Sequence, residues 1–187
     1  MIHCVSPFTA ETALETLPDA FRPCAGIVVM GQDGLVFAGQ RIDQQSDPQR
    51  WQWPQGGIMP GEQPSAAAMR ELYEETSICD IELMANTSHW LCYELPKSLR
   101  PAYWQGRYRG QIQLWFLARF TGDEAQIRLN SNDHKPEFHR WGWCDIEWTA
   151  RQAVAFKQAV YREVVRQFLP LIARHRAGKS GGDVKSP

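Results

Sequence analysis

The stretch that decides the fold runs from a glycine-rich loop into a helix: Gly56-Gly57-Ile58-Met59-Pro60-Gly61-Glu62 and, after seven residues, Arg70-Glu71-Leu72-Tyr73-Glu74-Glu75-Thr76-Ser77-Ile78. Glycine and proline interrupt regular elements, so the first part is expected to be an irregular loop. Pro64 suits the first turn of a helix, and the alanine-rich segment behind it favours helix. The sequence therefore predicts a loop followed by a helix over residues 64–76.

Three glutamates share one face of this predicted helix. Glu71, Glu74 and Glu75 stand at positions i, i+3 and i+4, which project in nearly the same direction. Like charges so close repel one another, and we expect Arg70 to point away from them, so the patch needs a cation from outside. Mg²⁺ or Mn²⁺ prefers such oxygen ligands on a rigid helix, and a solvated acidic face is the alternative. The stripe expected to face the core consists of Ser65, Met69, Leu72 and Thr76.

Apolar runs on both sides of this region predict strands. The first two, residues 24–30 and 35–41, form a hairpin across a glycine-containing turn. Further short strands are expected over residues 51–54, 81–85, 89–95, 111–120 and 141–146. An amphipathic helix is expected from about residue 150 to 175.

The 187 residues and their ordinary composition fit one globular domain. We expect an N-terminal extension over residues 1–20, the domain over 21–176 and a flexible tail over 177–187. The longest apolar run is far too short for a membrane span, and the N-terminus lacks the features of a signal peptide, so we expect no membrane segment and a cytoplasmic location. Five cysteines without a C-x-x-C pair predict reduced thiols.

A formal net charge of −1 conceals a segregation of charge along the chain. Residues 1–96 sum to −9, whereas residues 97–120 and residues 151–176 each sum to +5. Such a protein can hold cations in one place and polyanions in another. Solvated charged faces are the alternative interpretation.

The loop and helix resemble the Nudix box, G-x5-E-x7-R-E-U-x-E-E-x-G-U, in which U is an aliphatic residue. Eight of the nine defined positions match, and the exception is Ser77 in place of the last glycine. The resemblance implies an α/β (α+β) Nudix fold: a mixed sheet sandwiched between helices, with the box helix on one side and the C-terminal helix on the other. It also implies a divalent cation and hydrolysis of a nucleoside diphosphate linked to another group.

Carried over to this chain, the resemblance assigns roles to the box. The motif residues are Gly56, Gly57, Gly61, Glu62, Arg70, Glu71, Glu74 and Glu75. The last three would be carboxylate ligands of Mg²⁺ or Mn²⁺, Arg70 would orient the loop or a glutamate, and Glu62 would tie the loop to the helix. The metal would neutralise the pyrophosphate and lower the pKa of a bound water, and a box glutamate or a remote acid would accept the proton. A serine with positive φ at position 77 would cost about 1 kcal/mol.

Segments outside the box resemble the RNA pyrophosphohydrolase branch of this family, which removes pyrophosphate from a 5′-triphosphorylated RNA end or hydrolyses dinucleoside polyphosphates. They include residues 22–27, 51–57, 90–96, 110–116, 136–138 and 156–161. Plant-type diadenosine tetraphosphate hydrolases share much of this pattern. The resemblance implies that Glu137 is the remote carboxylate, as a metal ligand or as the base, alongside the catalytic Arg70, Glu71 and Glu75. The expected substrate contacts are Arg22, Arg41, Gln55, Phe156 and Lys157, and Phe156 either stacks on a base or belongs to the core.

Several residues depart from the pattern of the branch. Ile112 and Leu114 stand where lysines are common, which would weaken a phosphate path unless Arg107 and Arg109 compensate. Gln40 stands where an arginine is frequent, and Trp104 is the tryptophan most suited to a ligand contact. A non-catalytic Nudix-like binding module is a further alternative, but it usually lacks box glutamates, and all are present here.

Overall fold

The computed structural model describes residues 4–42, 50–130 and 135–180. Within them a mixed nine-stranded sheet has the order β1-β7-β8-β2-β3-β4, with β5 paired to β2, β6 to β8 and β9 to β3. The strands are β1 Val5–Thr9, β2 Phe21–Met30, β3 Val36–Arg41, β4 Trp51–Gln52, β5 Gln55–Gly57, β6 Ile81–Asn86, β7 His89–Glu94, β8 Gly110–Phe120 and β9 Phe138–Cys144. The α-helices are α1 Pro64–Thr76, α2 Ile146–Gln152 and α3 Gln158–Ser180.

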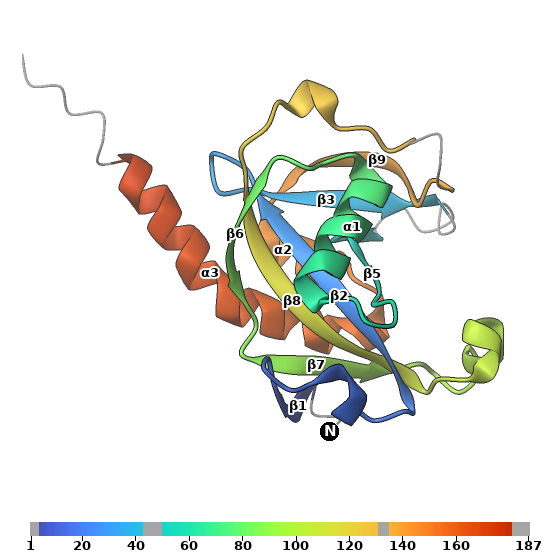
Figure 1. Ribbon diagram of the computed structural model, residues 1–187. Coiled ribbons are helices and arrows are strands. Elements are labelled where there is room, and N and C mark those ends of the chain that lie inside the picture. Colours follow the sequence, from blue (N-terminus) through green and yellow to red (C-terminus); the bar gives the residue numbers. More distant parts are fainter. Residues whose placement is uncertain (1–3, 43–49, 131–134, 181–187) are drawn as a thin grey trace, which may run out of the picture.

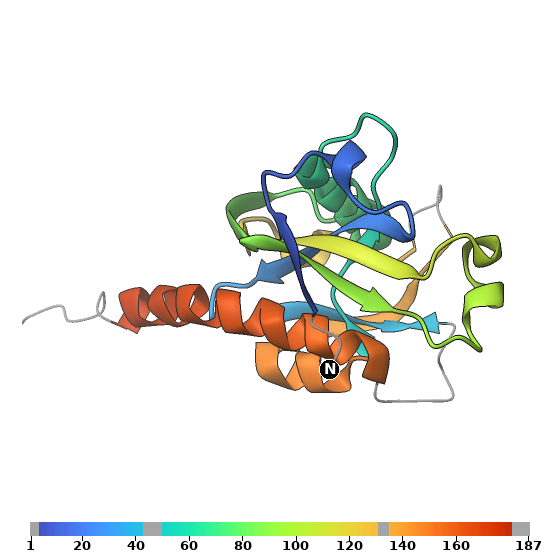
Figure 2. The ribbon, with the colours of Figure 1, turned by 90° about the horizontal axis from the view of Figure 1, so that it is seen from below.

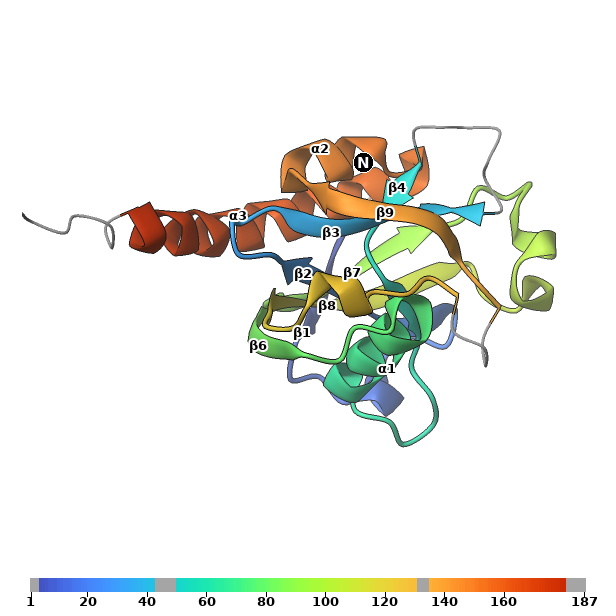
Figure 3. The same ribbon diagram turned by 90° about the horizontal axis from the view of Figure 1, so that it is seen from above.

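The parallel pair β2 and β8 forms the centre of the sheet. Their register runs without a break from Phe21 opposite Gly110 to Met30 opposite Arg119. Successive side chains of a strand point to opposite faces, so this pair contributes to two separate cores. Helix α1 covers one face, and α2 and α3 cover the other, as Figures 2 and 3 show from opposite sides. This is the expected arrangement of a mixed sheet between helices.

Helix α1 begins and ends where the sequence predicts. Its buried apolar side chains are Ala67, Ala68 and Leu72, which pack with Ile27 and Ile112 of the sheet. Two small alanines let the helix lie close to the strands. Leu72 and Thr76 of the predicted stripe are buried, but Met69, expected in the core, is 41% exposed, and Ala67 and Ala68 face the core instead.

The opposite core is built on aromatic side chains. The rings of Trp53 and Tyr161 stack with centroids 4.3 Å apart, and Trp115 packs edge-on against both. The main-chain N–H of Trp53 donates a 3.3 Å hydrogen bond to the hydroxyl of Tyr161. These contacts tie α3 to the segment between β4 and β5 and therefore hold α3 beside the glycine-rich loop.

The N-terminal segment contains a strand that the sequence analysis did not predict. Residues Val5–Thr9 form β1, which pairs antiparallel with β7 at the edge of the sheet. The strand is short and includes Pro7, which an edge position tolerates, and it shows no clean alternation. Tertiary pairing decides its conformation, and the sheet extends into residues expected to lie outside the domain.

The predicted helix over residues 150–175 is interrupted. Helix α2 ends at Gln152, Ala153 and Val154 are extended, and a 3-10 turn over Ala155–Lys157 precedes α3. The bend contains neither glycine nor proline, so no local signal marks it; the side chain of Gln158 donates to the carbonyl of Ala153 at 3.1 Å. Helix α3 continues to Ser180 and extends beyond the sheet (Figure 1).

Two smaller differences concern the ends of elements. Strand β9 starts at Phe138 and ends at Cys144, where residues 141–146 were expected. Residues 177–180 of the predicted tail are helical, and residues 181–187 lie outside the described chain. All five cysteines are free thiols, and none of the described helices is long and apolar enough to cross a membrane.

Ser77 ends α1 in the left-handed conformation, with φ 60°, and its N–H donates to the carbonyl of Tyr73 at 2.7 Å. Because this region is unfavourable for a residue with a Cβ, we expect Ser77→Gly to raise the free energy of unfolding by about 0.5–1 kcal/mol in urea titrations. Ser77→Ala keeps the Cβ and is the matched control, for which we expect no gain. Equal stability of all three proteins would contradict the strain argument.

Candidate active site

A single guanidinium joins the glycine-rich loop to helix α1. Arg70 contacts both oxygens of Glu62, at 2.8 and 3.0 Å, and donates to the carbonyl of Gly57 at 2.9 Å. It also contacts Glu71 at 2.9 Å and Glu74 at 3.3 Å. The hydrogen bond from Arg70 lowers the pKa of Glu62. Glu62 thus ties the loop to the helix as expected.

The prediction that Arg70 points away from the glutamates is wrong. Its backbone does lie off the glutamate face, but the long side chain folds back across the helix surface to reach the neighbouring turn. Part of the repulsion among the carboxylates is therefore relieved by a cation of the same helix. Glu71 and Glu74 are the two that Arg70 reaches.

Glu75 is buried and lies beyond the reach of Arg70. Only 4% of the residue is exposed, and neither carboxylate oxygen has a hydrogen-bond partner among the described residues. Burial raises its pKa well above the usual value, and the charges of Glu137 and Glu71 raise it further. Leaving a buried carboxylate without a partner is costly, which marks Glu75 as a residue that a cation would stabilise.

The loop glycines lie against the charged ends of two side chains. A Cβ on Gly56 would lie 2.0 Å from the carboxyl carbon of Glu71, and one on Gly57 would lie 2.1 Å from a guanidinium nitrogen of Arg22. A side chain at either position would therefore displace the charged group beside it. Gly61 has φ 77°, which a side chain would disfavour. Burial raises the pKa of Glu71, although Arg70 lowers it in part.

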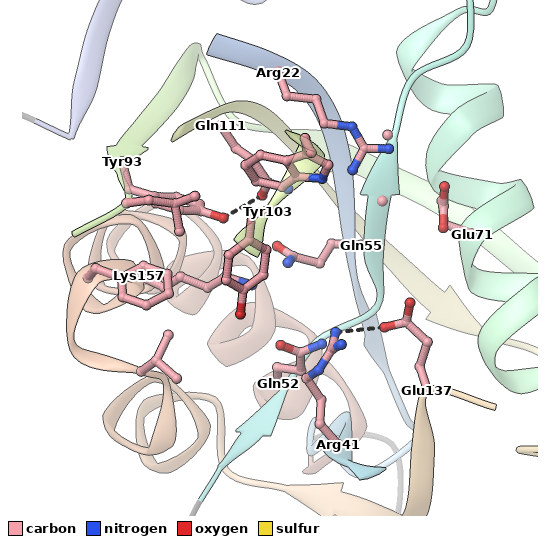
Figure 4. A pocket seen from close by; sticks show the side chains of 16 residues that line it. Arg22, Arg41, Gln52, Gln55, Glu71, Tyr93, Tyr103, Gln111, Glu137 and Lys157 are labelled. Atoms are coloured by element: carbon pink, nitrogen blue, oxygen red, sulfur yellow. Dashed lines mark hydrogen bonds and ion pairs between the residues drawn. The ribbon is translucent and has the colours of Figure 1, made fainter. Parts of the chain in front are cut away.

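A cavity of about 320 Å³, here called the pocket, opens beside this loop. Its lining includes nine residues that the sequence analysis assigned to the site: Arg22, Arg41, Gln55, Gly56, Gly57, Glu71, Glu137, Phe156 and Lys157. Trp104, the tryptophan most suited to a ligand contact, lines it as well. Figure 4 places Glu71 and Glu137 on one side of the pocket and Tyr93 and Lys157 on the other. Glu137 accepts a 2.7 Å salt bridge from Arg41.

The side of the pocket away from the glutamates carries aromatic rings and the ammonium of Lys157. The rings of Phe156 and Tyr93 lie 5.4 Å apart, and the ammonium of Lys157 lies 5.9 Å from the centre of the Tyr93 ring. Arg22 lies 5.5 Å above Trp104. Burial lowers the pKa of Lys157 to about 8, and the charge of Arg41 contributes to this. Phe156 therefore both packs on the core and faces the pocket.

Some pocket residues were not predicted. Tyr93 donates to the side-chain oxygen of Gln111 at 2.8 Å (Figure 4). Behind them, Gln113 donates to both Gln111 and Gln55 at 2.8 Å. Gln113 also accepts from Trp115 at 3.1 Å. Glutamines at alternating positions of an otherwise apolar buried strand were the available signal, because buried polar side chains need partners. Gln52, Leu95, Tyr103 and Val154 complete the lining.

Other sequence-predicted residues lie away from the pocket. Ile112 and Leu114 are buried under α1 on the other face of β8, so the expected weakening of a phosphate path does not apply. Arg109 pairs with Glu94 at 2.5 Å and Arg107 lies over Tyr108, so neither replaces those lysines. Glu74 and Gln40 do not line the pocket either.

The donor chemistry suits a divalent cation. Glu71, Glu75 and Glu137 offer hard oxygens near one another, and Glu75 has two unpartnered ones. Among the described residues, however, no group of three His, Cys, Asp or Glu side chains is close enough to hold an ion, and Arg70 and Arg41 form salt bridges with Glu71 and Glu137. The carboxylates therefore fit a divalent cation in the type of their donor atoms.

The chain is similar to known proteins over most of its length. The NUDIX domain family matches residues 20–168. An RNA pyrophosphohydrolase of Agrobacterium fabrum is 45% identical over 88% of this chain and 97% of that protein, and one of Cereibacter sphaeroides is 48% identical over 84% and 95%. The solved structure of the Escherichia coli dihydroneopterin triphosphate pyrophosphohydrolase is 25% identical, with a TM-score of 0.59 over 79% of this chain and 99% of that one.

The buried charge of Glu75 predicts a pH-dependent stability. Folding raises the pKa of Glu75. The unfolded chain therefore releases this proton at a pH of about 4.3, whereas the folded protein keeps it to a higher pH. Between these two pKa values the free energy of unfolding falls as the pH rises. In EDTA, Glu75→Gln should therefore raise Tm relative to wild type by more at pH 8 than at pH 5. The exposed Glu15→Gln is the control. A pH-independent difference for Glu75→Gln would show that the carboxylate is not held in a destabilising environment.

Proposed function

The chain belongs to the NUDIX family, and we propose that it is a hydrolase that removes pyrophosphate from the 5′-triphosphate end of RNA. The observation that carries this proposal is the lining of the pocket: Glu71 and Glu137 lie on one side, and Lys157 and Tyr93, with Phe156 against Tyr93, lie on the other (Figure 4). Arg22 and Arg41 add two further cations to the lining. A triphosphorylated nucleotide has the matching parts. Its phosphates need cations, and its base needs a flat apolar partner. The names of the relatives at 45% and 48% identity agree with this substrate.

Each polar residue then has a task in hydrolysis. Glu71, Glu74, Glu75 and Glu137 would hold Mg²⁺ or Mn²⁺, whose charge favours water attack on a pyrophosphate and lowers the pKa of the attacking water. Arg22, Arg41 and Lys157 bind the phosphates, while Gln55 orients them. The proton of the attacking water passes to a general base, which is Glu137 or one of the two box glutamates Glu71 and Glu75. Arg70 acts as a positioning residue through its contacts with Glu62 and the loop.

Hydrolysis of a dinucleoside polyphosphate, such as diadenosine tetraphosphate, is the second candidate. The same pocket accepts a phosphate chain, and Trp104 and Tyr103 offer a second aromatic surface near Arg22. The two substrates differ in length beyond the phosphate chain: a dinucleotide ends at its second nucleoside, whereas RNA continues out of the pocket.

A direct competition tests the proposal. Purified protein with Mg²⁺ is offered a short 5′-triphosphorylated RNA and diadenosine tetraphosphate, and kcat/KM is compared. We expect the larger value for RNA, with pyrophosphate or two successive phosphates as the released product. A larger value for the dinucleotide would support the second candidate, and activity on neither would contradict both.

Glu137→Gln should lower kcat by at least about tenfold, because it removes a candidate base or ligand. The same substitution also breaks the salt bridge to Arg41. Arg41→Gln breaks that bridge while keeping the carboxylate, so it is the matched control, and we expect its effect mainly in KM. Steady-state kinetics at saturating Mg²⁺ separates the two. An unchanged kcat in Glu137→Gln would show that Glu137 is neither the base nor a metal ligand.

Lys157→Ala should raise the apparent KM for RNA more than that for diadenosine tetraphosphate, since Lys157 lies on the side of the pocket that leads toward Gln52 and Val154. Lys157→Arg keeps the charge and should restore most of the affinity. The measurement is KM for both substrates at one salt concentration. Equal increases for the two substrates would argue against an RNA-specific contact.

A further inference from the structure

Three hollows continue from the pocket along the surface near α2 and α3. A narrow crevice shares Gln52, Val154 and Lys157 with the pocket. A hollow of about 200 Å³, here called the arginine hollow, shares Arg50, Ala153 and Val154 with this crevice and also contains Arg151. A groove between α2 and α3 comes next and shares Arg151 and Gln158 with that hollow. The lining residues therefore form an unbroken series from the pocket to the helices.

The break between α2 and α3 creates this series. Residues 153–155, which would lie inside a continuous helix, instead line the crevice and the arginine hollow. Val154 lines the pocket, the crevice and the hollow alike. The same bend that turns Phe156 and Lys157 toward the pocket thus opens a path away from it.

The path carries positive charge. Arg50 lines both the crevice and the arginine hollow, and Arg151 lines the hollow and the groove. Arg151 takes part in none of the salt bridges found in the described chain, and Arg162 adds a third cation in the groove. Arg166 is paired with Glu163, and Glu147 is the acidic residue that lines the groove. Arg151 and Arg162 belong to the segment of residues 151–176, which has a net charge of +5. Lys157 is the cation of this segment that lines the pocket.

We propose that the arginine hollow binds phosphates of the RNA chain downstream of the nucleotides held in the pocket. The inference rests on the proposed RNA 5′-end activity and deepens it, because it assigns a second contact region to the body of the substrate. Single-stranded RNA binds grooves in which cations follow its backbone. RNA continues past its first nucleotides, whereas a dinucleoside polyphosphate ends at its second nucleoside. An acidic segment of a partner protein is the competing occupant.

The experiment compares 5′-triphosphorylated RNAs of two and eight nucleotides and diadenosine tetraphosphate, with wild type, Arg50→Gln/Arg151→Gln and the control Arg174→Gln. Arg174 is exposed on α3 and lines none of the four cavities. The double variant should lower kcat/KM for the eight-nucleotide RNA by about tenfold and leave the two shorter substrates within about twofold. Its salt dependence should become shallower, since each lost phosphate contact removes about 0.7 from the log–log slope.

The outcomes separate this inference from the proposed function. If wild type cleaves neither RNA, the proposed function itself is wrong. If it cleaves RNA but the double variant loses nothing, or loses equally on all three substrates, the arginine hollow does not bind the RNA chain; a protein partner is then the remaining occupant. If the double variant fails to fold by circular dichroism, the exposed Arg151→Gln alone provides the same comparison, with a smaller expected loss of about threefold.

Discussion

Arg70 holds acceptors from two elements at once, and the geometry of the site depends on this. Its planar group of five N–H donors satisfies Glu62 and the carbonyl of Gly57 on the loop while it contacts Glu71 and Glu74 on the helix. Without this cation, adjacent carboxylates would repel one another and the loop would lose its link to α1. The loop fixed in this way brings the backbone of Gly56 against Glu71, so β5, the loop and α1 form one unit.

The parallel pairing of β2 and β8 directs polar side chains into the pocket and apolar side chains toward α1. Arg22 and Gln111 are partners in the register of this pair, and both face the pocket, while Ile112 next to Gln111 is buried under α1. The alternation of a strand thus separates the polar lining from the apolar support of the glutamate helix. The hydrogen-bonded glutamines satisfy one another, so they remain ordered in a largely apolar environment.

The bend after α2 decides how far the substrate surface extends. A continuous helix over residues 150–175 would pack Val154 and Phe156 on the core alone. The extended backbone at residues 153–154 exposes them to the pocket and opens the path toward Arg151. Contacts of Tyr161 with Trp53 hold the start of α3 in place. Aromatic packing in the core therefore stabilises the bend.

The sequence by itself determined the loop, the helix over residues 64–76 and the central strands, because these depend on local spacing and composition. The resemblance to the Nudix family, and not spacing, pointed to the charged residues of the pocket and to Ser77, which stands where the family has a glycine. Tertiary structure decided what local spacing does not contain: β1 forms only by pairing with β7, and α2 ends without a glycine or proline. The path of the Arg70 side chain and the burial of Glu75 were likewise decided there. Long side chains and burial depend on neighbours distant in the chain, which periodicity does not report.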